Sequence, residues 1–124
     1  MSRERNSRER PLTTLRKQEL LSQIERYVDE NLENHITLQT IASHFQVSVS
    51  TVTQLYQYRV GTTFHQFLTG RRMAVAEELI RQGVPLEEVG KRIGYTDHSS
   101  FYRAFKQAFG VSPREFKLGK TAEK

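Results

Sequence analysis

The sequence predicts an all-α protein of about seven helices, in which two similar helix pairs are joined by one long helix. Three observations lead to this fold class. Apolar residues recur at helical steps of three to five along most of the chain. Capping residues and helix-stopping glycines fall between these apolar runs. A segment of about thirty residues in the first half returns in the second half with matching apolar positions.

Composition limits the classes of protein to which the chain can belong. Its 124 residues have a net charge of +5 and include no cysteine. The length suits one domain or two very small ones, and the basic balance suits a polyanion such as nucleic acid. Lack of cysteine removes disulfides and thiolate metal sites and fits a cytoplasmic location. No apolar run approaches the roughly 18 residues of a membrane span, so we expect no membrane partner.

The first helices follow a polar tail. Residues 1–13 alternate Arg and Glu with Ser and Asn, and this composition predicts a disordered tail or an interdomain linker without a secretory signal. From Thr14 a single apolar face predicts a helix that ends near Asn34. Thr37 is then placed to cap a short helix over residues 38–44.

The second half of the chain begins with the long helix. Apolar positions on a broad face predict this helix over residues 63–82, and Gly83 ends it. Pro85, followed by two glutamates, opens a short helix that ends by Gly94.

The last two helices have clear capping signals. Asp97 is a good N-cap for a helix over residues 99–108. The capping box Ser112-Pro113-Arg114-Glu115 then opens a short last helix. Residues 119–124 are expected to form a disordered tail.

The stretch from Gln46 to Gly61 gives contradictory indications. Its first half alternates apolar with small polar residues, which in isolation favours a β-strand. The repeat favours a helix, because residues 38–67 align with residues 86–116 once one extra residue is allowed in the second turn. The second copy has helical apolar spacing, so residues 48–58 are also expected to be helical, with Ser48 as the N-cap.

Each copy therefore contains a helix, a tight turn and a second helix. The first helix has a small residue where the second must cross closely (Ala42 or Gly90), and an apolar residue follows the turn (Val47 or Tyr95). These features are typical of the helix-turn-helix motif, and two copies in register indicate it more strongly than one. The expected boundaries are 14–62 for the first subdomain, 63–82 for the linker helix and 83–118 for the second subdomain.

The most specific segment of the chain is VPLEEVGKRIGYTDHSSFYRAFKQAFGVSPREFK, at residues 84–117. Together with RRMAVAEELI in the long helix and ITLQTIASHFQVS and Gly61 in the first motif, it resembles the DNA-binding domain of AraC/XylS-type transcription regulators. The resemblance covers roughly residues 23–117, and the rest of the first motif departs from the family pattern. It implies a regulator of transcription, more specifically an activator, with double-stranded DNA and RNA polymerase as partners.

The exposed faces of the two recognition helices supply the candidate DNA contacts. Arg103 suits guanine O6 and N7, whereas Gln54, at the corresponding position of the first motif, suits adenine. The candidate base-contacting residues are Ser50, Thr51, Thr53, Gln54, His98, Ser99, Tyr102 and Arg103. The candidate phosphate-contacting residues are Arg59, Thr63, Arg71, Lys106, Ser112 and Arg114.

The long helix has a length that suits two successive major grooves. About 20 residues span ~30 Å, and the grooves on one face of DNA lie ~34 Å apart. One chain is therefore expected to insert both recognition helices into successive major grooves without forming a dimer. The first motif has fewer cations, so we expect it to be poorly engaged or dependent on an effector.

Other functions were weighed against DNA binding. The sequence has no paired acid-base constellation, Gly-rich phosphate loop or nucleophile motif, so we expect no enzyme activity and no cofactor. Its histidines, at 35, 44, 65 and 98, are too scattered for the usual spacing of metal ligands. The alternative function is a helical protein-interaction module with weak or lost DNA binding. The chain is expected to be either a stand-alone regulator or the DNA-binding part of a larger effector-responsive one.

Overall fold

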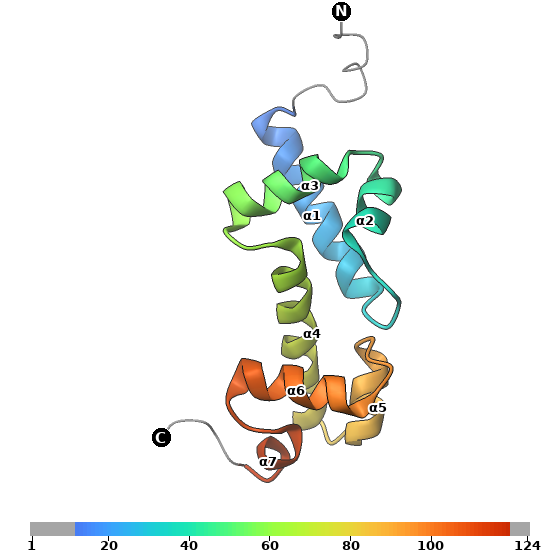
Figure 1. Cartoon of the computed structure of the whole chain (residues 1–124), viewed down its shortest axis with the longest axis vertical. Coiled ribbons are helices and arrows are strands. Elements are labelled where there is room, and N and C mark those ends of the chain that lie inside the picture. Colours follow the sequence, from blue (N-terminus) through green and yellow to red (C-terminus); the bar gives the residue numbers. More distant parts are fainter. Residues whose placement is uncertain (1–11, 120–124) are drawn as a thin grey trace, which may run out of the picture. The chain divides into compact units, whose positions relative to one another are not determined.

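The computed structural model describes residues 12–119, and this part of the chain contains helices and no strand (Figure 1). The predicted all-α fold class is therefore confirmed. The predicted tails lie mostly outside the described residues, although Thr13 forms the N-cap of the first helix. The elements are α1 (Thr14–Glu30), α2 (Leu38–Phe45), α3 (Val49–Leu55), the π-helix η2 (Tyr56–Val60), α4 (Phe64–Arg81), α5 (Leu86–Arg92), α6 (His98–Phe109) and α7 (Pro113–Lys117).

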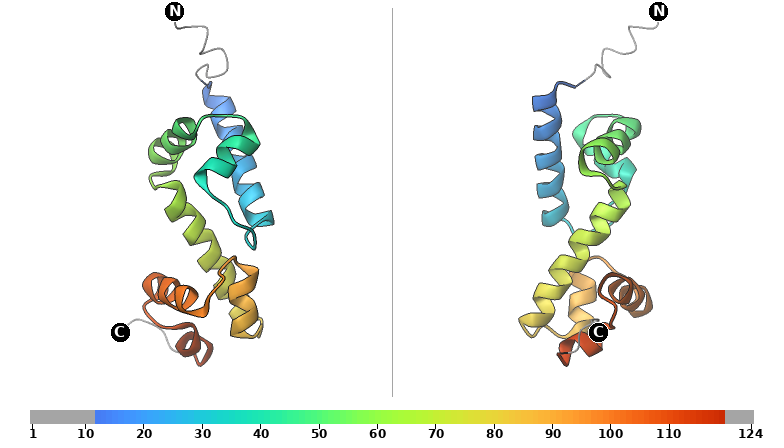
Figure 2. Two further views of the ribbon diagram at one scale, coloured as in Figure 1. Left: turned by 45° about the vertical axis from the view of Figure 1, so that its right-hand side comes forward. Right: turned by 90° about the vertical axis from the view of Figure 1, so that its left-hand side faces the viewer.

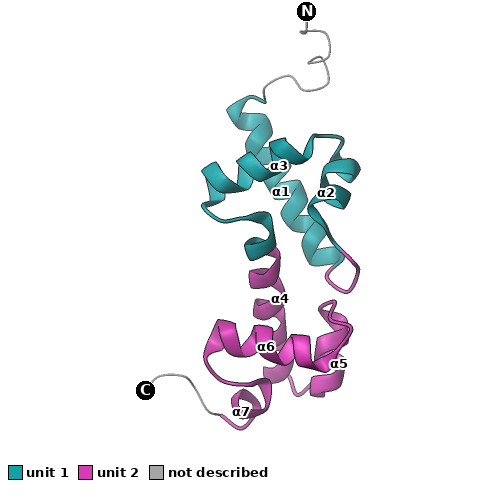
Figure 3. Cartoon of the chain, in the orientation of Figure 1, with its two compact units in different colours: residues 1–31, 36–67 teal, residues 32–35, 68–124 magenta. Residues whose placement is uncertain are grey.

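The chain forms two compact units (Figure 3). Unit 1 comprises residues 1–31 and 36–67, which include α1, α2, α3, η2 and the first turn of α4. Unit 2 comprises residues 32–35 and 68–124, which include the rest of α4 with α5, α6 and α7. Residues 32–35, in the loop between α1 and α2, thus belong to unit 2, although the helices on both sides of the loop belong to unit 1.

The first helix ends earlier than its apolar pattern predicts. The predicted end was near Asn34, whereas α1 ends at Glu30 with Asn31 as its C-cap. The side-chain amide of Asn31 donates a hydrogen bond to the carbonyl oxygen of Tyr27 at 2.8 Å, which satisfies a carbonyl at the helix end. Leu32 is buried beyond the end of the helix, so it fits the apolar pattern without being helical.

Side-chain caps begin the helices at the predicted places. Thr37 and Thr40 form a reciprocal capping box at α2, and Ser48 caps α3. Between these helices, Gln46 adopts a left-handed conformation with φ 59°, which allows the tight turn. The strand-like stretch is therefore helical from Val49, as the repeat predicts.

The second helix of the first pair is not α-helical throughout. After Leu55 the backbone widens into η2, and the N–H of Gly61 donates to the carbonyl of Tyr56 at 2.7 Å, five residues back. Gly61 then ends the helix with φ 91°, a conformation that glycine adopts without strain. The sequence pattern did not predict this π-helix.

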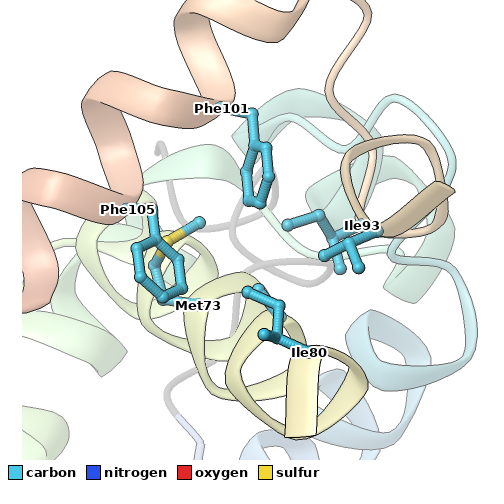
Figure 4. Packing of buried hydrophobic residues seen from close by; sticks show 7 residues of the cluster. Met73, Ile80, Ile93, Phe101 and Phe105 are labelled. Atoms are coloured by element: carbon cyan, nitrogen blue, oxygen red, sulfur yellow. The ribbon is translucent and has the colours of Figure 1, made fainter. Parts of the chain in front are cut away.

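Unit 2 has an apolar core built from three helices (Figure 4). Figure 2 shows α5 and α6 beside the C-terminal part of α4 in both views. Phe101 and Phe105 of α6 are fully buried, and their rings lie 6.1 Å apart between centroids. The buried members of the core are Met73, Ala76, Ile80, Val89, Ile93, Phe101 and Phe105.

The two small residues predicted at the helix crossings are both buried. A Cβ on Gly90 would lie 3.5 Å from the ring of Phe101, which is ordinary van der Waals contact. Ala42 of the first pair already has such a Cβ and is 4% exposed. Close crossing of the two helices therefore needs a small residue at this position, but not glycine.

Among the described residues, no helix combines the length and the apolar character needed to cross a membrane.

Candidate nucleic-acid interface

A tight turn precedes α6 and fixes where that helix begins. Gly94 has φ 95°, and the N–H of Tyr95 donates to the carbonyl of Gly90 at 3.0 Å, which closes the turn on the end of α5. Asp97 then caps α6, because its Oδ1 accepts the backbone N–H of Ser100 at 2.7 Å. Phe101, in the first turn of the helix, anchors it in the core.

The four base-contact candidates of the second motif lie together on α6. His98, Ser99 and Arg103 are exposed, whereas Tyr102 is half-buried and packs on the edge of the core. The rings of His98 and Tyr102 lie 4.5 Å apart between centroids. Residues three and four apart face the same side of a helix, so Lys106 continues this surface one turn further. We call these five residues the α6 stripe.

The corresponding surface of the first motif is smaller and uncharged. Ser50, Thr53 and Gln54 are exposed on α3, at the positions of Ser99, Tyr102 and Arg103. Thr51 is half-buried instead, and its hydroxyl oxygen accepts a hydrogen bond from the hydroxyl of Ser48 at 2.9 Å. The structure thus places Thr51 in the helix cap, where Ser100 lies in the second motif.

Sequence reasoning missed Val49 as a candidate. It is the first residue of α3, at the position that His98 has in α6, and its side chain is 39% exposed. An exposed apolar side chain on a recognition helix can contact a thymine methyl group. The repeat left this pairing open, because the extra residue could lie anywhere in the turn at residues 96–99, and the starts of α3 and α6 now define it.

The six phosphate-contact candidates are divided between the two units. Arg59 lies exposed in η2 and Thr63 lies just before α4, both in unit 1. The other four belong to unit 2: Arg71, Lys106, Ser112 and Arg114. Arg71 is half-buried on α4, whereas Lys106 and Arg114 are exposed.

Two of the phosphate candidates have structural roles in capping. The Oγ1 of Thr63 accepts the N–H of Gln66 at 3.0 Å, and the N–H of Thr63 donates to the side-chain oxygen of Gln66 at 3.0 Å. Ser112 and Glu115 make the same reciprocal pair at α7, at 3.1 and 3.0 Å. The N–H groups of Thr63 and Ser112 are therefore already bonded within the chain.

Charge is distributed unevenly around the two recognition helices. No Asp or Glu occurs between residues 34 and 76, so α2, α3 and η2 contain no acid. Around α6, Asp97 is the one acid between Glu88 and Glu115. This distribution leaves both recognition surfaces open to an anionic partner. In the described part of the chain, His, Asp and Glu side chains do not cluster in a way that could hold a metal ion.

Comparison with protein families finds a match to one family model, described as a helix-turn-helix domain, over residues 41–118. Among curated proteins, the arabinose operon regulatory protein of Salmonella typhimurium is 28% identical over 95 residues, which cover 75% of this chain and 34% of that protein. The probable transcriptional regulator LumQ of Photobacterium leiognathi is 28% identical over 96 residues, which cover 77% of this chain and 39% of LumQ. The chain therefore spans little more than a third of these relatives.

Solved structures share the arrangement of helices. The C-terminal domain of AraT, a response regulator from Geobacillus stearothermophilus, superimposes with a TM-score of 0.77 at 27% identity, over 85% of this chain and 88% of that one. The DNA-binding domain of AdpA, solved in complex with a target DNA, superimposes with a TM-score of 0.74 at 21% identity, over 80% of this chain and 90% of that one. The second likeness shows a shared fold.

Proposed function

This chain belongs to the AraC/XylS-type family of helix-turn-helix transcription regulators, and we propose that it binds double-stranded DNA in a sequence-specific manner to regulate transcription. The observation that supports this most directly is the α6 stripe, where donors and a ring lie exposed opposite a core face of Phe101 and Phe105. A helix of this kind, anchored on one side and polar on the other, fits the major groove.

In this proposal α6 is the principal recognition helix. Arg103 donates to guanine O6 and N7, while His98, Ser99 and Tyr102 contact neighbouring bases or sugars. Lys106, one turn further along, contacts a phosphate and sets the register of the helix. Arg114 contacts a further phosphate, and Ser112 contacts one through its hydroxyl, because its N–H is already bonded to Glu115.

The role of α3 in DNA binding is secondary in this proposal. Gln54 suits adenine, and Val49, Ser50 and Thr53 present small side chains to the groove. Arg59, in the same unit as α3, and Arg71, in unit 2, contact phosphates in this proposal. Since α3 itself has no cation, we propose that it engages weakly or only when an effector acts.

The wider role of the protein follows from its family. We propose that it acts in the cytoplasm, activates transcription together with RNA polymerase, and binds DNA as a monomer. The helices described here correspond to the DNA-binding part of such a regulator, whether alone or within a larger effector-responsive chain. The family consists of transcription regulators rather than enzymes.

Binding measurements with three arginine and lysine variants test the proposed function. On the preferred site, Arg103→Ala should reduce the binding free energy by about 1–3 kcal/mol and should weaken the preference for guanine at one position. Lys106→Ala should weaken binding about equally on all sequences and reduce the salt slope by about 1. Arg16→Ala, on the exposed face of α1, is the control and should change neither property.

The alternative function makes a different prediction in the same measurement. A helical module that binds only proteins would show no sequence preference and no steep salt dependence. Equal losses for Gln54→Ala and Arg103→Ala would instead refute the secondary role of α3.

A further inference from the structure

A continuous chain of hydrogen bonds joins the cap of α6 to its candidate recognition arginine. The Oδ2 of Asp97 accepts the hydroxyl of Ser100 at 2.9 Å, in addition to the backbone bond that caps the helix. The Oγ of Ser100 in turn accepts a bond from the guanidinium of Arg103 at 3.4 Å. The hydroxyl therefore donates to a carboxylate and accepts from a cation, so that both charges orient it in the same direction.

At the three corresponding positions, the first motif has neither the carboxylate nor the guanidinium. Ser48 caps α3 and donates its hydroxyl to Thr51 at 2.9 Å, and Gln54 follows where Arg103 lies in the second motif. A hydroxyl is thus a sufficient cap in this fold. The carboxylate at residue 97 is not needed to begin the helix.

A carboxylate at this place also has a cost for DNA binding. Asp97 is exposed at the start of α6, and a phosphate that approaches the helix there meets a like charge. Hydrogen bonds from Ser100, and then the charge of Arg103, hold the pKa of Asp97 below its usual range, so it is ionised at neutral pH. The same charge that repels a phosphate attracts the guanidinium of Arg103.

We propose that Asp97, acting through Ser100, is a positioning residue that holds Arg103 ready for a base edge, while its charge repels phosphates that approach the start of α6. The inference rests on the proposed role of α6 as a recognition helix. An arginine restrained in advance loses less conformational freedom when it meets the correct guanine. The repulsion of phosphate weakens binding in wrong registers, which also increases specificity.

The variant Asp97→Asn separates positioning from capping. Asparagine caps a helix about as well as aspartate, so the substitution removes the charge and keeps the cap. Affinity is measured for three DNAs: the preferred site, the same site with the guanine that Arg103 contacts replaced by another base, and unrelated DNA. We expect Asp97→Asn to reduce discrimination at the guanine by roughly 3- to 10-fold and to bind unrelated DNA more tightly. Ser100→Ala should reduce the same discrimination.

Two controls make the outcome specific. Ser48→Asn places the same residue at the cap of α3, where no charge is removed, and should leave discrimination at the guanine unchanged. In an Arg103→Ala background, Asp97→Asn should cause no further loss of discrimination, because the residue that it positions is absent.

The result that overturns the inference differs from the one that overturns the proposed function. If the unchanged protein prefers a site and Asp97→Asn retains the full discrimination, the positioning role is wrong and the function stands. If the unchanged protein has no sequence preference, the proposed function and the inference both fail.

Discussion

Residues 56 and 105 occupy matching places in the two helix pairs, yet one is tyrosine and the other phenylalanine. Tyr56 is fully buried, and its ring lies 5.3 Å from that of Phe64 and 5.1 Å from that of Phe67 between centroids. Within residues 12–119 its hydroxyl has no hydrogen-bond partner. Burial, with a smaller effect from Glu25, raises the pKa of Tyr56 far above its usual range. The ring therefore stabilises the core of unit 1, whereas the hydroxyl does not.

Tyr56→Phe is accordingly expected to keep or raise stability. The substitution removes a buried hydroxyl without a partner, whose burial costs about 1–3 kcal/mol, and keeps the ring contacts. Tyr56→Ala should instead lose about 3–5 kcal/mol, as large aromatic truncations do. Denaturant unfolding of both variants measures the difference. A clear loss of stability in Tyr56→Phe would show that the hydroxyl is bonded.

At the scale of the element, α5 and the turn that follows it each contain a glycine, and the two glycines have different requirements. Gly90 lies inside α5, where a Cβ would make ordinary contact with Phe101. Gly94 has φ 95°, and a Cβ there would clash with the carbonyl oxygen of Leu32 and approach the guanidinium of Arg72 at 2.8 Å. Only the second position requires glycine both for its backbone and for its surroundings.

Alanine at the two positions should therefore have opposite effects. Gly90→Ala should stabilise the protein by up to about 1 kcal/mol, because alanine favours a helix over glycine. Gly94→Ala should destabilise it by at least about 1–3 kcal/mol, through backbone strain and the clash. Thermal unfolding of the two variants shows directly whether each substitution raises or lowers the stability. A stable Gly94→Ala variant would mean that the turn can adopt another conformation.

The sequence predicted most elements because their ends are set by local chemistry. The caps Thr37, Ser48, Asp97 and Ser112 act within one turn of their helices, and a pattern of residue types is enough to find them. The π-helix η2 was missed because its i–5 bond leaves the apolar spacing almost unchanged. The engagement of Thr51 in a cap was missed because hydroxyls suit both capping and base contact.

At the scale of the whole molecule, α4 connects two recognition helices of unequal charge. Selection of bound sequences from a random DNA pool should therefore return a strong half-site that contains guanine, from α6. A weaker half-site rich in adenine should lie about 10 bp away, from α3. Arg103→Ala should erase the first preference and retain the second. Recovery of one half-site alone would mean that α3 makes only backbone contacts.

The assignment of residues 32–35 to unit 2 affects how the protein can be divided. The two helix pairs resemble successive copies in the sequence. However, residues 32–35 of unit 2 lie between the two segments that form unit 1. A cut within α4 would leave residues 68–124 without the segment whose Asn34 carbonyl accepts a hydrogen bond from Arg72 at 3.3 Å. The two halves of the sequence therefore cannot be exchanged independently. A chimera that takes residues 68–124 from another protein should take residues 32–35 from it as well.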